Sequence, residues 1–299
     1  MHPAPSIIAF TTLSGLGFGL LFWLALGYPP VVGWVACLFF GLAYLLAVGG
    51  LLASALHLGN PQRALKAFSQ WRSSWLSREA VLAVATLTVM GLYAAALVFT
   101  NTRLATFGWP GAALCAATVF ATSMIYAQLK TVPRWNHWTT PALFLALALA
   151  GGAALAGQSR IAAPLMLGVG ALQLLAWLAG DQRFAARGST LASATGLGTP
   201  GTVRQFAPPH TGSNYLLREM VFHVARKHAL RLRLIALALM SLIPAAVLAL
   251  APGHLGGAFA ILSHLAGTLV ARWLFFAEAE HTVGLYYGAH DYAPHHTGG

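Results

Sequence analysis

Long apolar runs separated by short polar segments dominate this sequence of 299 residues. About 17–25 apolar residues let an α-helix cross a hydrocarbon core of about 30 Å. Glycines, prolines and basic residues punctuate the runs. The pattern predicts an all-α, polytopic membrane protein, a single integral domain over residues 1–299 built as a bundle of eight transmembrane helices. The expected spans are 7–27, 31–58, 78–100, 109–129, 140–156, 161–180, 232–250 and 255–276, with a kink at Pro244.

Composition supports the same class. Hydrophobic residues make up 58% of the chain and charged residues 8%, with a mean hydropathy of +0.70, whereas a soluble domain carries about 25% charged residues. The net charge of +11 would suggest nucleic acid in a soluble protein. Here the basic residues gather in loops, so we expect no nucleic-acid partner and interpret the charge as an orientation signal.

The short loops predict the orientation in the membrane. Six Lys and Arg residues lie in the loops after the second and fourth spans, and two lie in the loops on the opposite side, so both termini are expected in the cytoplasm. The long loop 181–231 belongs to the same side. Its stretch 214–231 has helical amphipathic spacing, typical of an interfacial helix or of a docking surface for a soluble partner. The tail 289–299 is expected to be flexible.

The segment between His57 and Glu79 carries the strongest candidate chemistry. His57 ends the second span, where an imidazole could pass a proton to a quinone carbonyl, or could simply offset the helix dipole. Glu79 follows Ser77 at the start of the third span. A carboxylate there could relay protons, or could lie in a first turn capped by Ser77. Arg63, between them, could pair with Glu79 or with a partner protein.

Aromatic and histidine side chains extend this candidate site. Trp71, Trp75 and Trp135 stand beside basic residues, which is typical of an interfacial belt, although one or two of them could stack on a quinone ring. His281 is expected at the same membrane surface as His57, or as part of a solvated helix end. No haem is expected, because His264 is the only histidine well inside a span and bis-histidine ligation needs two that face each other.

Other sequence features exclude further chemistry. The two cysteines, Cys37 and Cys115, are too few for an iron–sulfur cluster, which takes about four ligands. The chain has no Walker loop, no dinucleotide fingerprint, and no serine or zinc constellation. No metal site is therefore expected in this chain.

Several motifs together resemble a known family. These are HLGNPQRA followed by SRE, YAQLKTVPRW before the fifth span, and WLFF with HTVG at the end of the eighth. They resemble the DmsC-like membrane anchor subunits of molybdoenzymes such as dimethyl sulfoxide reductase. The resemblance implies a quinone or quinol site with His57 and Glu79 in catalytic roles. The residues expected to bind the quinone are His57, Arg63, Trp71, Trp75, Glu79, Tyr126, Trp135 and His281.

The resemblance also implies partners and cofactors. Partners would be an iron–sulfur subunit of the four-cluster ferredoxin-like type and a molybdopterin catalytic subunit. Molybdenum-bis(pyranopterin guanine dinucleotide) and the iron–sulfur clusters, including [4Fe-4S], would reside in those subunits only. This chain would hold ubiquinone or menaquinone, in contact with membrane lipid, in a bacterial inner (cytoplasmic) membrane.

One departure narrows the branch. In dimethyl sulfoxide reductase the partner-binding side faces the periplasm, whereas the charge count here places it in the cytoplasm. The stretches MHPAPS, VRQFAPPHT and REMVFHVARKHA look more like the SoeC anchors of the cytoplasmic sulfite dehydrogenase. The expected function is therefore electron transfer from sulfite oxidation to quinone.

Three alternatives remain. The first is a menaquinol-oxidising anchor of a reductase, because the sequence does not fix the direction of electron flow. The second is a secondary transporter, which would place polar residues near the middle of the bilayer and matching broken helices in two halves. The third is a structural anchor that binds no quinone.

Overall fold

The computed structural model describes residues 1–55, 60–198, 201–204, 206–207, 216, 220, 228–251 and 253–287, and within these all regular secondary structure is helical. The long helices are α1 Pro5–Leu26, α2 Gly33–Ala55, α3 Trp75–Phe99, α4 Ala105–Ala127, α5 Thr139–Leu155, α6 Ser159–Ala186 and α11 His254–Ala277. One continuous helical stretch comprises α9 Ala229–Leu237, η3 Ala238–Leu242 and α10 Ile243–Leu250. Short helices in the connections are η1 Pro61–Phe68, α7 Leu191–Thr195 and η4 Thr282–Tyr287. The predicted all-α class is confirmed.

Within the described residues, seven helical stretches are long and apolar enough to cross a membrane. They are α1 to α4, α6, the stretch from α9 to α10, and the stretch that begins with α11. The shorter α5 is also apolar, and its 17 residues span about 26 Å at 1.5 Å per residue. The span predicted at 140–156 coincides with α5.

The kink predicted at Pro244 takes the form of a π-helical turn. Residues Ala238–Leu242 form this turn between α9 and α10. Proline lacks a backbone N–H, and its ring clashes with the carbonyl group four residues earlier, here that of Met240. The wider π turn accommodates the ring. It also leaves the Met240 carbonyl oxygen to accept a hydrogen bond from His264 Nδ1, at 2.6 Å.

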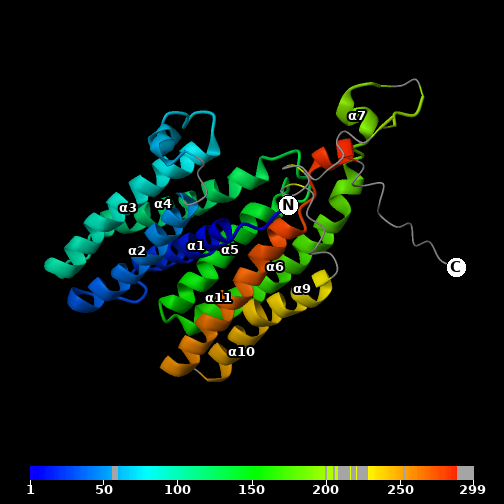
Figure 1. The fold of residues 1–299 in the computed structure, drawn as a ribbon. Helices are drawn as coiled ribbons and strands as arrows, with labels where there is room; N and C mark the ends of the chain where they lie inside the picture. Colours follow the sequence, from blue (N-terminus) through cyan, green and yellow to red (C-terminus); the bar gives the residue numbers. More distant parts are fainter. Residues whose placement is uncertain are drawn as a thin grey trace.

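Helix α1 lies in the middle of the bundle (Figure 1), with α2, α3 and α4 on one side and α5, α6 and α9 to α11 on the other. Small residues allow its neighbours to approach closely. A Cβ atom on Gly19 would lie 1.9 Å from the carbonyl oxygen of Ala148 in α5, and one on Gly17 would lie 2.3 Å from the backbone nitrogen of Ala47 in α2. Such contacts stabilise membrane helices, because burial from lipid gives little hydrophobic gain.

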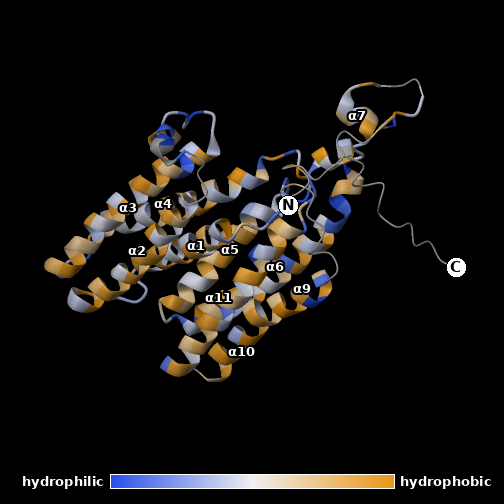
Figure 2. Ribbon diagram, in the orientation of Figure 1, coloured by the Kyte–Doolittle hydropathy of each residue, from blue (hydrophilic) through white to orange (hydrophobic). Residues whose placement is uncertain are grey.

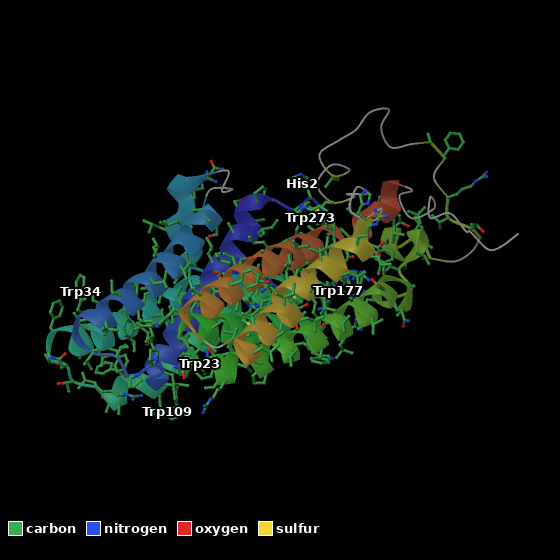
Figure 3. All side chains as sticks on the ribbon, turned by 90° about the horizontal axis from the view of Figure 1, so that it is seen from below. His2, Trp23, Trp34, Trp109, Trp177 and Trp273 are labelled. Atoms are coloured by element: carbon green, nitrogen blue, oxygen red, sulfur yellow. The ribbon has the colours of Figure 1, made fainter. Side chains whose placement is uncertain are left out.

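The surface pattern fits a bundle surrounded by lipid. Figure 2 shows mostly hydrophobic colour along the rods and hydrophilic colour concentrated in end segments. Trp34 and Trp109 are 74% and 75% exposed, and Figure 3 places both toward one end, away from His2 and Trp273. Exposed tryptophans at a bundle end are typical of the membrane–water interface.

The opposite end gathers distant parts of the chain. Figure 1 shows the N-terminus, η1, α7 and η4 there, and we call it the N-terminal end. The Met1 amino group donates a hydrogen bond to the Ala279 carbonyl oxygen at 2.9 Å.

Two loop predictions need correction. The loop predicted at 59–78 contains η1, and α6 continues to Ala186, so the long connection begins six residues after Asp181. The predicted amphipathic helix 214–231 lies mostly outside the described residues, and the tail 289–299 lies wholly outside them.

Candidate functional site

The buried carboxylate of Glu79 is the centre of the candidate site. Helix α3 begins at Trp75 with Ser74 at the N-cap position, so Ser77 is buried inside the helix and Glu79 lies beyond the first turn. The predicted Ser77 cap is therefore wrong. Glu79 is 4% exposed, and the Thr122 hydroxyl of α4 donates a hydrogen bond of 2.5 Å to its Oε1. Burying a carboxylate costs free energy unless partners compensate for the lost hydration, so the helix-dipole interpretation does not explain this residue.

Tyr126 and Trp135 belong to an aromatic cluster beside Glu79. The Trp135 ring stacks on Phe275 at 5.1 Å between centroids, and Tyr126 meets Trp135 edge-on at 5.4 Å. The Trp135 indole N–H donates to the Phe275 carbonyl oxygen at 2.9 Å, and Trp135 is 2% exposed. Its ring faces are thus used in packing. Tyr126 lies within electrostatic reach of both Glu79 and Arg272.

Other predicted site residues of the segment form its surface. Arg63 is exposed in η1, and Trp71 is 53% exposed. Trp75 is partly buried and packs edge-on against Phe120 of α4 at 5.9 Å between centroids. The guanidinium carbon of Arg78 lies 4.4 Å from the Trp75 ring centroid. Trp75 therefore joins the surface of this segment to the helix that carries Glu79.

The two predicted histidines have different outcomes. His57 lies outside the described residues, so the structure does not place it relative to Glu79. His281 is partly buried, and its Nδ1 accepts a hydrogen bond of 3.0 Å from the backbone N–H of Val283. That contact caps the start of η4, which gives His281 a structural role.

A small polar cavity lies directly behind Thr122. It is enclosed by α1, α4, α5 and α11, and its volume is about 10 Å3. Its polar lining includes Thr122, Thr268, His264 and Arg272. Arg272 is 5% exposed, and its guanidinium carbon lies 3.6 Å from the centroid of the Phe144 ring. A buried cation and a buried carboxylate thus lie on either side of Thr122.

An ion cluster ties together four elements at the N-terminal end. Arg233 of α9 contacts both carboxylate oxygens of Asp181 at 2.6 and 2.7 Å, and its Nε donates to Glu278 at 2.8 Å. Arg134, from the α4–α5 connection, contacts Asp181 at 2.6 Å and Glu278 at 3.6 Å. We call these four residues the ion cluster. It joins α6, α9 and the end of α11 to the α4–α5 connection.

The net positive charge of this end comes from arginine and lysine. The pKa of His137 is held below its ordinary value, first by partial burial and then by the nearby Arg183 guanidinium. Its imidazole is therefore neutral at pH 7. The ion cluster itself is balanced, so the exposed cations of the η1 segment, among them Lys66 and Arg72, remain available to an acidic partner.

Comparison with known proteins gives these features a family. The family model described as DMSO reductase anchor subunit (DmsC) matches residues 31–288. This chain belongs to the DmsC family. A relative from Allochromatium vinosum, described as the SoeC subunit of sulfite dehydrogenase, is 33% identical over 325 residues, covering 96% of this chain and 99% of the relative. No solved structure matches the chain.

Membership of the DmsC family confirms the resemblance inferred from the motifs. This chain is a multi-pass membrane anchor subunit and a homologue of the SoeC subunit of a sulfite dehydrogenase. The sequence did not single out Thr122 or Arg272, because a lone threonine or arginine in an apolar run carries no local signal. The ion cluster was also missed, since 47 residues separate Arg134 from Asp181.

Proposed function

We propose that this chain is the quinone-reactive anchor of a molybdenum and iron–sulfur oxidoreductase that passes electrons from sulfite to membrane quinone. Two kinds of observation support the proposal. The family and the relative are anchor and sulfite dehydrogenase subunits by description. The single observation that carries the quinone assignment is the buried Glu79 carboxylate at the N-terminal end, hydrogen-bonded by Thr122.

The proposed topology has eight spans with both termini in the cytoplasm of a bacterium. The hydrogen bond between Met1 and Ala279 holds the two ends of the bundle's main path on one side. An even number of crossings is needed for that, and seven stretches qualify by length and composition. Counting α5, whose 17 residues reach the lower end of the usual range for a span, gives eight. The basic loops lie at the same end, which the positive-inside rule assigns to the cytoplasm.

In the proposed reaction, quinone takes up two electrons and two protons to become quinol. Electrons would arrive from a [4Fe-4S] cluster of the iron–sulfur partner, and the molybdenum cofactor would act in the catalytic partner. Glu79 would give one proton to a quinone oxygen, and His57 would give the other. General acid catalysis of this kind contributes about 10²–10⁴-fold to a rate.

The surface residues would have supporting roles. We place Trp75 against the quinone ring, with Trp71 and Arg63 at the entrance. Tyr126 would line the buried side near Glu79. The contacts of Trp135 and His281 are packing and capping contacts, so we propose that these two residues support the site without touching the quinone.

A second location for the quinone is less favourable. An apolar groove of about 610 Å3 lies between the start of α1 and α11, with Leu232, Leu269 and Trp273 in its lining. None of the residues that line it is an acid, a base or a histidine, so it offers no proton to a quinone oxygen. It suits a hydrocarbon chain. A Leu269→Trp substitution that partly fills it is expected to leave quinone-linked turnover unchanged.

Isolation of the native complex tests the function. The chain would be purified from its own membrane in mild detergent, and the polypeptides, molybdenum, iron and quinone that accompany it would be identified. We expect a molybdenum subunit, an iron–sulfur subunit and sulfite-dependent quinone reduction. Quinol-dependent reduction of another substrate would favour the menaquinol-oxidising alternative. A complete complex without bound or reducible quinone would favour a structural anchor, and a chain without redox partners would favour a transporter.

A further inference from the structure

The cavity behind Thr122 contains more unsatisfied polar atoms than the protein itself accounts for. Thr12 Oγ1, His264 Nε2, Thr268 Oγ1 and Arg272 Nε are buried without a hydrogen-bond partner among the described residues, and all four residues line this cavity. Their exposures are 2%, 2%, 4% and 5%. Buried polar atoms are almost always hydrogen-bonded to protein or to ordered water. A cavity of about 10 Å3 offers room for about one water molecule.

The hydrogen bond of His264 fixes which nitrogen faces the cavity as an acceptor. Its Nδ1 lies 2.6 Å from the Met240 carbonyl oxygen, which can only accept, so Nδ1 carries the hydrogen. In the neutral imidazole Nε2 is then an unprotonated acceptor. A Cβ atom on Gly151 would lie 3.2 Å from Nε2, so the glycine leaves space beside it. The acceptor is therefore open to a proton donor in the cavity.

The polar lining follows one face of α11. His264, Thr268 and Arg272 are four residues apart, so they lie above one another on the helix. The row extends over about 12 Å at 1.5 Å per residue. At the level of Arg272 the cavity meets Thr122, whose hydroxyl donates to Glu79. The oxygen lone pairs of Thr122 can accept a hydrogen bond from the cavity at the same time.

We propose that this cavity binds water, that His264 is a proton-accepting site within it, and that protons pass from it to Glu79 through the Thr122 hydroxyl. This rests on the proposed function in one respect, namely that Glu79 supplies a proton to quinone. In the relay, a protonated His264 releases the proton on Nε2 to water, which passes one to the Thr122 oxygen. The Thr122 hydroxyl gives its own hydrogen to the carboxylate. One proton leaves the imidazole and one reaches Glu79, while water and Thr122 end unchanged.

The charged surroundings of the relay are few. Arg272 on α11 is the other ionisable side chain in the cavity lining, and Glu79 and Tyr126 lie on the far side of Thr122 and Arg272. The lining contributed by α1 is neutral and polar, and that from α5 is apolar. Neutral walls leave the water, Thr122 and His264 as the groups that exchange protons.

The first experiment asks whether the cavity is wet, and it needs no enzymatic activity. The full chain, labelled with 15N-histidine and reconstituted in phospholipid vesicles, would be studied by water-edited solid-state NMR. The His264→Asn variant assigns the signal, because Asn retains the donor to Met240 and removes Nε2. We expect a protonated Nδ1 and magnetisation transfer from water to the His264 ring within milliseconds. A ring that receives no magnetisation from water overturns the proposal.

The second experiment asks whether the site supplies Glu79. Sulfite-driven reduction of a soluble quinone would be measured in the complete complex, in H2O and in D2O. Thr122→Val keeps the shape and removes the hydroxyl, whereas Thr122→Ser retains it. We expect Thr122→Val and His264→Asn to slow turnover about tenfold or more and to increase the solvent isotope effect, and Thr122→Ser to restore both.

The matched control is His254→Gln, at the exposed start of the same helix, which should behave as wild type. Wild-type turnover and isotope effect in both Thr122→Val and His264→Asn would overturn the relay even if the cavity is wet. A wild-type complex that reduces no quinone would instead contradict the proposed function, and the NMR result would still decide whether the cavity holds water.

Discussion

The ion cluster allows a quantitative prediction at Arg233. This side chain holds Asp181 through two contacts of 2.6 and 2.7 Å and Glu278 through one of 2.8 Å. The Asp181 side chain is 43% exposed and that of Glu278 is 5% exposed. Exposed ion pairs contribute about 0.2–1 kcal/mol, whereas removing one partner of a buried pair costs about 3–5 kcal/mol. Because Arg134 remains 3.6 Å from Glu278, we expect Arg233→Met to lower the free energy of unfolding by about 2–4 kcal/mol.

Double-mutant cycles test how that loss is divided. Arg233→Met would be combined separately with Glu278→Gln and with Asp181→Asn. Unfolding would be followed by tryptophan fluorescence as a denaturing detergent is added to mixed micelles, under conditions where refolding is complete. We expect the coupling energy with Glu278 to exceed that with Asp181, although Asp181 makes more and shorter contacts. An equal or larger coupling with Asp181 would refute the reasoning that burial decides.

Three further predictions follow from individual contacts. Trp135→Phe removes the donor to the Phe275 carbonyl, so thermal unfolding of the purified complex should shift to lower temperature by the equivalent of about 1 kcal/mol or more, with quinone turnover retained; an unchanged transition would contradict the packing role. Lys66→Glu combined with Arg72→Glu should weaken retention of the iron–sulfur partner, measured by co-purification over a salt series; retention equal to wild type would exclude this surface as the docking site. A fluorescent-protein fusion at the C-terminus should fluoresce in the cytoplasm while an alkaline phosphatase fusion stays inactive, and the reverse result would invert the topology.

The span pattern was predictable because apolar periodicity and turn residues are local signals. Predicted and observed helix ends differ by a few residues at most positions, and α6 was extended because 181–186 continues the helix through polar residues. The first turn of α3 was misplaced for a similar reason. Ser77 looks like a cap in the sequence, but Ser74 precedes the helix and Ser77 is buried by α3 packing.

The candidate site was predictable only in part. Glu79 stood out because charged residues are rare in this chain, and the family motifs point to the same residue. Its partner Thr122 lies 43 residues away, so nothing local could join the two. The same holds for the row of His264, Thr268 and Arg272, whose function depends on the cavity that α1, α4 and α5 close around it. Tertiary packing creates that cavity, and a single sequence does not display it.

The most direct test of the account is to compare two electron acceptors in the complex that carries Glu79→Gln. This substitution preserves shape and removes the acid. Sulfite-driven reduction of quinone requires the anchor, whereas reduction of a soluble acceptor such as ferricyanide draws electrons from the partner proteins. We predict that quinone reduction falls about 100-fold or more, while ferricyanide reduction and the polypeptide composition of the complex stay at wild-type levels. Quinone reduction at the wild-type rate in this variant would contradict the claim that the buried carboxylate serves the quinone.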